Sequence, residues 1–489
     1  MIADHKPYPA YKDTGVGWLG EVPEHWEVRR PRNAVDMRVS NVDKHTKEGE
    51  LPVRLCNYVD VYKNDRITEH MSFMRATATT EEVERFRLEP GDVLITKDSE
   101  AWNDIGVPAL VEYTSEDFVC GYHLAVLRPR KALLIGCYLL RAWQSPAVAY
   151  QCHVAANGVT RYGLSHDAIK SAFLPLPPLP EQAAIVRFLD HADRRIRRYI
   201  RAKQKLIKLL EEQKEAIVHR AITRGLDPNV RLKLSGVEWL RDVPEHWGKT
   251  RLKFIATQII DCLHATPVYS ETGAYPAIRT ADVQPGRLLL ESARRLDEEH
   301  YHRWTARMAP VKGDILYTRE GERFGIAAMV PGDVRLCISQ RMMAFRIHAS
   351  QNSAYVMWQI NCRHVYAQAA ADLIGAAAPH VNVGRIKNFW LALPPRPEQD
   401  EIMAVVEQAI RQPNAAIERA HDEIKLLREY RTRLITDVVT GKLDVREAAA
   451  RLLEEAEEPE PLDDTEAPAE GDEDGEGADL DVAPEVAEV

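Results

Sequence analysis

A long stretch of the chain, residues 181–223, has apolar residues at alternating steps of three and four. It contains no glycine or proline that would interrupt a helix. The pattern predicts one helix with an apolar seam, on the order of 60 Å long at about 1.5 Å per residue. An apolar seam of this length needs an equally long partner helix to cover it. The predicted seam comprises Ile185, Leu189, Ala192, Ile196, Tyr199, Leu206, Leu210 and Ile217, interrupted by Lys203 and Gln213.

A second stretch, residues 398–440, supplies that partner. It begins after PPRPEQ, as the first begins after PPLPEQ, and it ends in TGKLD where the first ends in TRGLD. Because Pro413 lies inside it and proline removes a backbone donor, we expect a kink or break near residues 411–414. The alternative is that these are two ordinary helices in separate domains. The second seam comprises Ala420, Ile424, Leu427, Leu434 and Val438, with Arg431 among them.

The repeat is larger than the helix. WLGEVPEHW at residues 18–26 returns as WLRDVPEHW at 239–247, so two globular modules each open with this motif and close with a long helix. Within each module, buried strands are predicted at 91–97 and 313–319 and at 124–128 and 342–346, with helices at 139–151 and 354–371. The expected fold class is α+β with short strands. Between these shared segments the modules diverge, as expected if each recognises a different target.

Charge is distributed unevenly. The net charge is −10, but residues 446–489 carry eighteen acidic residues against two arginines, so the rest of the chain is mildly basic. The tail, rich in Ala, Pro and Gly, is expected to be disordered beyond about Glu455. No apolar run is long enough for a membrane span, and the seven cysteines form no CxxC pair. These features favour a cytoplasmic protein.

Motifs for catalysis are missing. No glycine-rich methyl-donor loop, Asn/Asp-Pro-Pro-aromatic site or GxxxxGK[ST] phosphate loop occurs. Glu423 and Lys425 form an ExK triplet, but within a predicted helix rather than on a nuclease strand. The pairs Cys262/His264, His300/His302 and Cys362/His364 lack the second pair that a metal site needs. We therefore expect no catalytic residues, metal or cofactor in this chain.

The motifs WLGEVPEHW, GDVLITK, PPLPEQAAIV and LLREYRTRLITDVVTGKLDVR together resemble the specificity (S) subunit of type I restriction–modification systems. The resemblance covers residues 8–446. It implies two target-recognition domains separated by two helices that pair as an antiparallel coiled coil. It further implies that the chain reads a bipartite, gapped double-stranded DNA sequence and docks two methyltransferase (M) subunits and restriction (R) subunits. S-adenosylmethionine, ATP and Mg²⁺ would act on those partners only. Pro413 and the acidic tail depart from the family pattern.

The resemblance divides the chain into five parts: target-recognition domain 1 (1–180), the central helix (181–227), target-recognition domain 2 (228–397), the C-terminal helix (398–445) and the tail (446–489). Two alternatives stay open: a methylation-only targeting subunit without a nuclease partner, and a coiled-coil scaffold with two protein-binding lobes.

Candidate DNA contacts follow the shared strands or lie in the matching late loops, where the modules diverge. Basic residues between Arg194 and Lys208 form a further strip that faces solvent, DNA phosphates or a partner. The tryptophans shared by both modules (Trp18, Trp26, Trp239 and Trp247) are expected to pack in the scaffold. The candidate base-reading residues are Lys97, Asp98, Asn103, Tyr122, His123, Thr160 and Arg161 in the first module, and Arg319, Glu320, Arg323, Gln340, Arg341 and His380 in the second.

Overall fold

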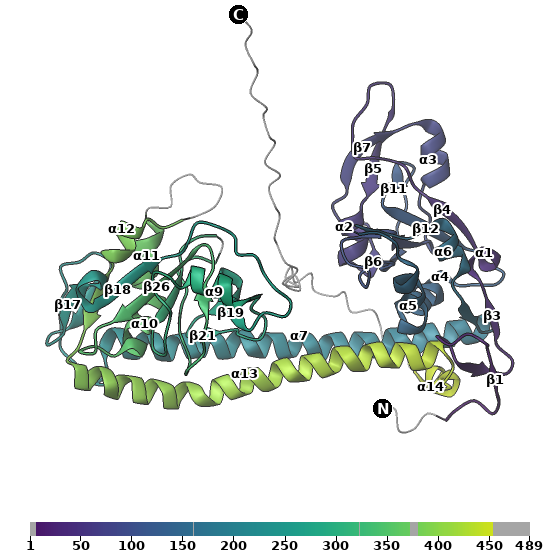
Figure 1. Cartoon of the computed structure of the whole chain (residues 1–489). Helices are drawn as coiled ribbons and strands as arrows, with labels where there is room; N and C mark the ends of the chain where they lie inside the picture. Colours follow the sequence, from purple (N-terminus) through teal and green to yellow (C-terminus); the bar gives the residue numbers. More distant parts are fainter. Residues whose placement is uncertain (1–5, 160, 322, 372–379, 453–489) are drawn as a thin grey trace, which may run out of the picture. The chain divides into compact units, whose positions relative to one another are not determined.

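Two long helices, α7 (Leu179–Arg224) and α13 (Arg396–Val439), run alongside each other in the computed structural model (Figure 1). The structure describes residues 6–159, 161–321, 323–371 and 380–452. Ile207 packs against Ala420 and Ile424. Lys203 pairs with Glu423 at 2.5 Å, and Lys214 Nζ donates to Asn414 Oδ1 at 3.3 Å. Because numbers rise on one helix as they fall on the other, the pairing is antiparallel, as predicted.

The predicted seam of α7 is wrong in its middle. Tyr199 and Leu206 are 53% and 41% exposed, whereas Ile207 is buried and Ile200 partly buried in the contact with α13. After Ile196 the sequence offers two parallel apolar stripes, and the structure uses the one that steps by four to Ile200. That stripe brings Lys203 to the contact, where its charge is matched by Glu423.

Of the kink or break predicted near residues 411–414, the break is wrong, because α13 is one continuous helix through Pro413. A proline removes a single backbone hydrogen bond from the ladder. The ring of Pro413 is buried and the next side chain, Asn414, accepts a hydrogen bond from Lys214 on α7. Packing against the partner helix thus holds the chain helical through the proline.

The chain divides into two compact units, one made of residues up to Ala192 and from Thr432, the other of Asp193–Arg431. Unit 1 contains a five-stranded sheet in the order β4-β12-β8-β10-β6 and a three-stranded sheet in the order β11-β5-β7. Aliphatic and aromatic side chains of both sheets form a common core. The strands are β4 (Val35–Val39), β12 (Leu124–Pro129), β8 (Val93–Thr96), β10 (Pro108–Val111), β6 (Arg66–Ile67), β11 (Phe118–Cys120), β5 (Leu51–Cys56) and β7 (Met74–Ala78).

The remaining elements of unit 1 are short. The helix predicted at 139–151 is two helices, α4 and α5, because Pro146 opens α5 and disfavours helical backbone at Ser145. These elements are β1 (Tyr11–Asp13), β2 (Glu21–Pro23), β3 (Glu27–Arg29), α1 (Pro31–Ala34), α2 (Tyr58–Lys63), α3 (Thr80–Phe86), β9 (Asp98–Ser99), α4 (Gly136–Gln144), α5 (Pro146–Ala155), β13 (Tyr162–Gly163), α6 (His166–Ser171), β14 (Leu174–Leu176) and α14 (Arg446–Arg451).

Unit 2 repeats this plan. A four-stranded sheet has the order β18-β26-β23-β24, and a three-stranded sheet has the order β22-β19-β25. The predicted strand pairs at 91–97/313–319 and 124–128/342–346 are thus confirmed as β8/β23 and β12/β26. The strands are β18 (Ala256–Asp261), β26 (Met342–Ile347), β23 (Ile315–Thr318), β24 (Ala327–Met329), β22 (Arg295–Leu296), β19 (Tyr275–Ile278) and β25 (Cys337–Ile338).

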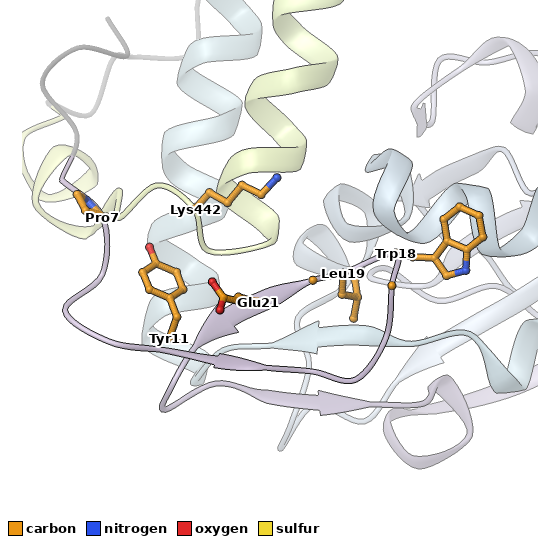
Figure 2. Close-up of a pocket in the computed structure, with 8 residues that line it drawn as sticks. Pro7, Tyr11, Trp18, Leu19, Glu21 and Lys442 are labelled. Atoms are coloured by element: carbon orange, nitrogen blue, oxygen red, sulfur yellow. The ribbon is translucent and has the colours of Figure 1, made fainter.

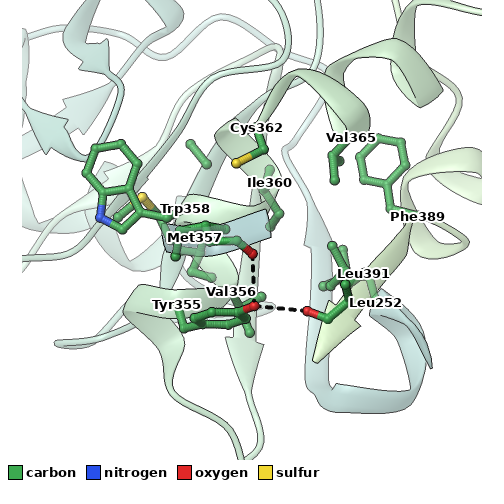
Figure 3. Packing of buried hydrophobic residues seen from close by; sticks show 14 of the residues in the cluster. Leu252, Tyr355, Val356, Met357, Trp358, Ile360, Cys362, Val365, Phe389 and Leu391 are labelled. Atoms are coloured by element: carbon green, nitrogen blue, oxygen red, sulfur yellow. Dashed lines mark hydrogen bonds between the residues drawn. The ribbon is translucent and has the colours of Figure 1, made fainter. Parts of the chain in front are cut away.

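The core of unit 2 gathers on α10 (Ser353–Asn361), where Tyr355 lies among aliphatic side chains (Figure 3). Its hydroxyl group contacts the carbonyl oxygens of Ile222 and Ala392 at 3.1 and 3.2 Å, tying α7 to the module. The other elements are β15 (Leu232–Leu234), β16 (Asp242–Pro244), β17 (Gly248–Arg251), α8 (Leu252–Ile255), η1 (Thr280–Asp282), β20 (Val283–Gln284), β21 (Arg287–Leu288), α9 (Glu298–Trp304), α11 (Arg363–Ala370), α12 (Val383–Lys387) and β27 (Trp390–Leu393).

The repeated EHW and PEQ motifs meet in each unit. In unit 1, Glu181 accepts a hydrogen bond from Trp26 Nε1 at 2.9 Å and lies 2.7 Å from His25 Nε2. In unit 2, Glu398 binds Trp247 and His246 at 2.9 and 2.8 Å. The first-turn carboxylate of each long helix is therefore the acceptor for the motif that opens its own module.

In unit 1, the residue that follows α13 packs against the motif that opens the module. At Gly441, after α13, φ is +75° and an added Cβ would lie 2.2 Å from the ring of Pro23.

Trp26 and Trp247 are buried, as the scaffold prediction requires, but Trp18 is 48% exposed. Trp18 is one of the residues around a pocket of about 450 Å³ that Tyr11 and Lys442 also line (Figure 2). Among the described residues, no helix has the length and apolarity of a membrane span.

Candidate nucleic-acid interface

Three segments of unit 1 converge beyond the end of β8. The backbone N–H of Lys97 donates to the carbonyl of His123 at 2.9 Å, and Leu164 donates to the carbonyl of Lys97 at 2.8 Å. The next two residues, β9, pair antiparallel with β13. Backbone hydrogen bonds thus fix the end of β8, the turn before β12 and the loop that contains β13 to one another. We call this meeting point the junction of the unit.

The side chains at this junction form a polar cluster. The carboxylate of Asp98 accepts from Lys97 Nζ at 2.7 Å and lies 2.6 Å from His123 Nδ1. Burial favours the protonated acid, but the hydrogen bonds and charges of Lys97 and His123 outweigh it and hold the pKa of Asp98 below its usual value. His123 has a φ of +52°, a strained conformation for a residue other than glycine. The backbone therefore presents this imidazole at some cost in stability.

Unit 2 has the same junction with other side chains. Arg319 N donates to the carbonyl of Arg341 at 2.9 Å, and Val381 N donates to the carbonyl of Arg319 at 3.1 Å. The backbones of Glu320 and His380 form an antiparallel β-bridge. Arg341 has a φ of +67°, at the position that His123 occupies in unit 1. The two modules therefore share a strained residue facing a strand end, with different chemistry on it.

The guanidinium group of Arg319 is mostly buried between carboxylates. Its Nη1 donates to Asp261 at 2.7 Å, and Nη2 contacts Glu320. Within the described residues, Arg319 Nε and Gln340 Oε1 are buried without a hydrogen-bond partner.

Most of the predicted contact residues come together at the two junctions. In unit 1 these are Lys97, Asp98, Tyr122, His123 and Arg161; in unit 2 they are Arg319, Glu320, Gln340, Arg341 and His380. Two others lie apart. Asn103 is exposed on the loop after β9, and Arg323 donates to the carbonyl of Val283 at 3.0 Å. Thr160 lies outside the described residues.

Sequence reasoning missed a set of aromatic residues beside the unit 1 junction. Tyr58 and Tyr62 of α2 stack with centroids 5.5 Å apart, and Tyr62 Oη donates to Asp104 at 2.6 Å. That hydrogen bond, with burial, raises the pKa of Tyr62 to about 12. Trp102 is 53% exposed on the intervening loop. The only available signal was an aromatic pair four residues apart on a short helix, which also fits ordinary packing.

The basic strip lies on α7. Arg194, Arg198, Arg201, Lys205 and Lys208 are exposed and spaced by four and three, so they share one face. The neighbouring face carries the exposed Tyr199, Leu206 and Leu209. Such a surface suits phosphate groups or an acidic partner.

The part of the chain that the structure describes holds no group of three or more His, Cys, Asp or Glu residues able to bind a metal ion. In the first of the pairs noted in the sequence, Cys262 is buried and His264 Nε2 lies 3.2 Å from Asp261 Oδ2.

Comparison with known proteins identifies the modules. The family model "Type I restriction modification DNA specificity domain" matches residues 56–209 and 264–426, more than half of the chain. A putative type I restriction enzyme MjaX specificity subunit from Methanocaldococcus jannaschii is 24% identical over 237 residues, covering 48% of this chain and 53% of that protein. The EcoKI specificity subunit from Escherichia coli K12 is 22% identical, covering 80% and 83%.

A solved chain from a study of complex assembly and conformational transition in the type I R-M system has the same fold. It superposes with a TM-score of 0.57 at 18% identity, covering 86% of this chain and 99% of that one. The chain spans between about half and two thirds of the two M. jannaschii relatives that it matches. The family model, matched twice by modules with equivalent junctions, decides the assignment: the chain belongs to the type I restriction modification DNA specificity domain family.

Proposed function

We propose that this chain is the DNA-reading specificity subunit of a type I restriction–modification complex and has no catalytic chemistry of its own. The observation that carries the proposal is the matched junction: the same backbone framework presents Lys97, Asp98 and His123 in one unit and Arg319, Glu320 and Arg341 in the other. A common framework with different polar groups suits a protein that reads two unlike half-sites.

The target is then a bipartite double-stranded DNA sequence, with one half-site for each unit. The paired helices α7 and α13 would set the gap between the half-sites, and the basic face of α7 would contact phosphates or a partner. Two methyltransferase subunits and the restriction subunits would dock on this chain in the cytoplasm. S-adenosylmethionine, ATP and Mg²⁺ would bind to those partners.

The test uses the two strained residues. Glycine adopts positive φ without steric strain. His123→Gly and Arg341→Gly therefore remove the reading side chains and leave the turn unstrained. Methylated-adenine sequencing in cells that also express the methyltransferase subunit should show a bipartite motif. Each variant should relax recognition in one half-site only, and the affected half should differ between them. The two variants serve as controls for each other.

Other outcomes separate the alternatives. In cells that express restriction subunits as well, a normal methylated motif without cleavage of unmodified DNA would favour a methylation-only subunit. A protein-binding scaffold would be favoured, and the proposal rejected, by a third outcome. In that outcome the chain assembles with protein partners, no methylated motif is found, and neither variant changes the methylation pattern.

A further inference from the structure

The surface around the unit 1 junction is aromatic. Tyr62, Trp102 and Tyr122 are 40%, 53% and 38% exposed, and Tyr122 lies against His123 with centroids 3.6 Å apart. Helix α2, which carries Tyr62, contacts β8, the strand that leads into Asp98. These rings therefore flank the polar cluster rather than a separate face of the module.

Backbone hydrogen bonds define the equivalent positions in unit 2. Gly121 N donates to the carbonyl of Cys56 at 2.8 Å, and Ser339 N donates to that of Ile278 at 2.9 Å. Four residues after each of these carbonyl residues, an aspartate caps the following turn: Asp60 binds the N–H of Asn57, and Asp282 binds that of Arg279. By this register Tyr58 corresponds to Thr280 and Tyr122 to Gln340. Counted along the chain, Tyr62 falls at Gln284, where the helix α2 of unit 1 is replaced by the strand β20.

The chemistry at these positions differs consistently. Each of these three tyrosines is replaced in unit 2 by threonine or glutamine. The aromatic residue of the corresponding loop, Phe324, is buried and stacks on the 43% exposed Tyr366 with centroids 5.0 Å apart. The more exposed Trp102 lies edge-on to His153 at 6.4 Å. Unit 1 thus carries aromatic rings at these positions where unit 2 carries smaller hydroxyl or amide side chains, of which Gln284 is exposed.

Core packing does not explain exposed rings, and their placement is fixed rather than incidental. Tyr62 is held by its hydrogen bond to Asp104 and by stacking on Tyr58. In the major groove, the one apolar group on a base edge is the C5-methyl group of thymine. An apolar rim around polar reading groups therefore suits a half-site in which thymine methyl groups lie beside hydrogen-bonding edges.

We propose that unit 1 recognises T·A pairs in its half-site by apolar contact of Trp102 and Tyr62 with thymine methyl groups, whereas unit 2 reads its half-site by hydrogen bonds. This inference rests on the proposed function. Trp102 and Tyr62 would be specificity-determining residues, and the difference between the units would be a difference in the kind of contact as well as in target sequence.

The test compares thymine with deoxyuridine, which lacks only the C5-methyl group. The complete complex with methyltransferase subunits is titrated with its target duplex, with deoxyuridine placed in one half-site at a time. Burying one methyl group is worth about fourfold in affinity. We expect a loss of about fourfold per contacted thymine in one half-site and no loss in the other.

Variants assign the effect to the rings. Trp102→Ala and Tyr62→Ala should abolish the sensitivity to deoxyuridine. Tyr62→Phe, which keeps the ring and loses the bond to Asp104, should retain it. Gln284→Ala, the matched change in unit 2, should leave it unaltered. The three positions of these four variants are exposed, so the variants keep the fold.

Three results would overturn the inference: equal sensitivity in both half-sites, sensitivity in neither, or sensitivity that survives both alanine variants. Loss of methyltransferase subunits from the alanine variants, with unchanged response to deoxyuridine, would make the rings a protein-docking surface instead. In each case, binding and methylation of the unmodified target by the wild-type complex would leave the proposed function standing.

Discussion

The two units use the same residues to hold themselves together and different residues to face outward. The anchoring contacts are nearly identical, since Trp26 binds Glu181 at 2.9 Å and Trp247 binds Glu398 at the same distance. At the junctions, His123 is matched by Arg341 and Tyr122 by Gln340. The comparison shows that the repeat preserves buried hydrogen bonds and backbone geometry, while the exposed side chains on that framework are free to vary.

The largest effect should come from the anchoring carboxylates, which also differ in detail. Glu181 is 10% exposed and contacts His25, Trp26, Tyr8 and Arg446, whereas Glu398 is 27% exposed and contacts His246 and Trp247. Glu181→Ala leaves a buried indole N–H unpaired, so we expect a loss of about 3 kcal/mol in the unfolding free energy of unit 1. Glu398→Ala should cost about 1–2 kcal/mol in unit 2.

Hydrogen exchange in β8 and β23 would report each unit separately. Glu181→Gln, which keeps an acceptor oxygen, serves as the control and should recover most of the loss. Equal effects of the two alanine variants, or effects in both units at once, would contradict the expected asymmetry.

A buried histidine should make unit 2 the more acid-sensitive of the two. Burial lowers the pKa of His364 to about 4, and the charge of His219 adds to the effect. The corresponding position in unit 1 is Ala147. In the unfolded chain the pKa of a histidine is about 6.5. Below this pH the unfolded chain therefore binds a proton at His364 that the folded unit does not bind. The buried histidine therefore costs unit 2 no stability above about pH 6.5, and the cost grows to about 3 kcal/mol as the pH falls to 4.

Urea denaturation of the full chain between pH 7 and 4 measures this slope. His364→Asn should flatten it for unit 2 and leave unit 1 unchanged. A slope that persists in the variant would assign the acid sensitivity to other groups.

Exchanging the outward residues should barely alter stability. Tyr62→Gln and Tyr122→Gln introduce the side chains that unit 2 carries at the equivalent positions. Because both rings are exposed, we expect less than about 0.5 kcal/mol change in unfolding free energy. Thermal unfolding of the double variant, with Val126→Ala in the core as a positive control, tests this. A large loss would mean that the rings belong to the scaffold.

The smallest effect on recognition should follow removal of residues 453–489. This segment is strongly acidic and would compete with phosphates for the basic surface. Its deletion should strengthen binding to random DNA at low salt and leave the methylated motif unchanged for both half-sites. Loss of methylation with unaltered DNA affinity would instead indicate that the segment docks a partner.

Sequence reasoning succeeded where a signal occurred twice. The long helices, the strand pairs and the junction residues were all predicted from matched motifs, and the structure confirms the helices and strands. It failed where one pattern had two solutions. Tyr199 and Ile200 are both apolar, and only contact with α13 selects Ile200. The exposed aromatic residues of unit 1 were overlooked because exposure of a ring depends on tertiary packing that composition and spacing do not encode.

The contact of Gly441 with Pro23 has a consequence for synthesis. Unit 1 combines the first residues of the chain with the end of α13, whereas unit 2 is one continuous segment. Nearly 250 residues separate Ala192 from Gly441, which corresponds to about 10–50 s of translation. During that interval the surface of Pro23 and Trp26 that Gly441 covers stays open on a nascent chain. The module made first is thus the one completed last, and its uncovered surface is a natural place for a chaperone to act.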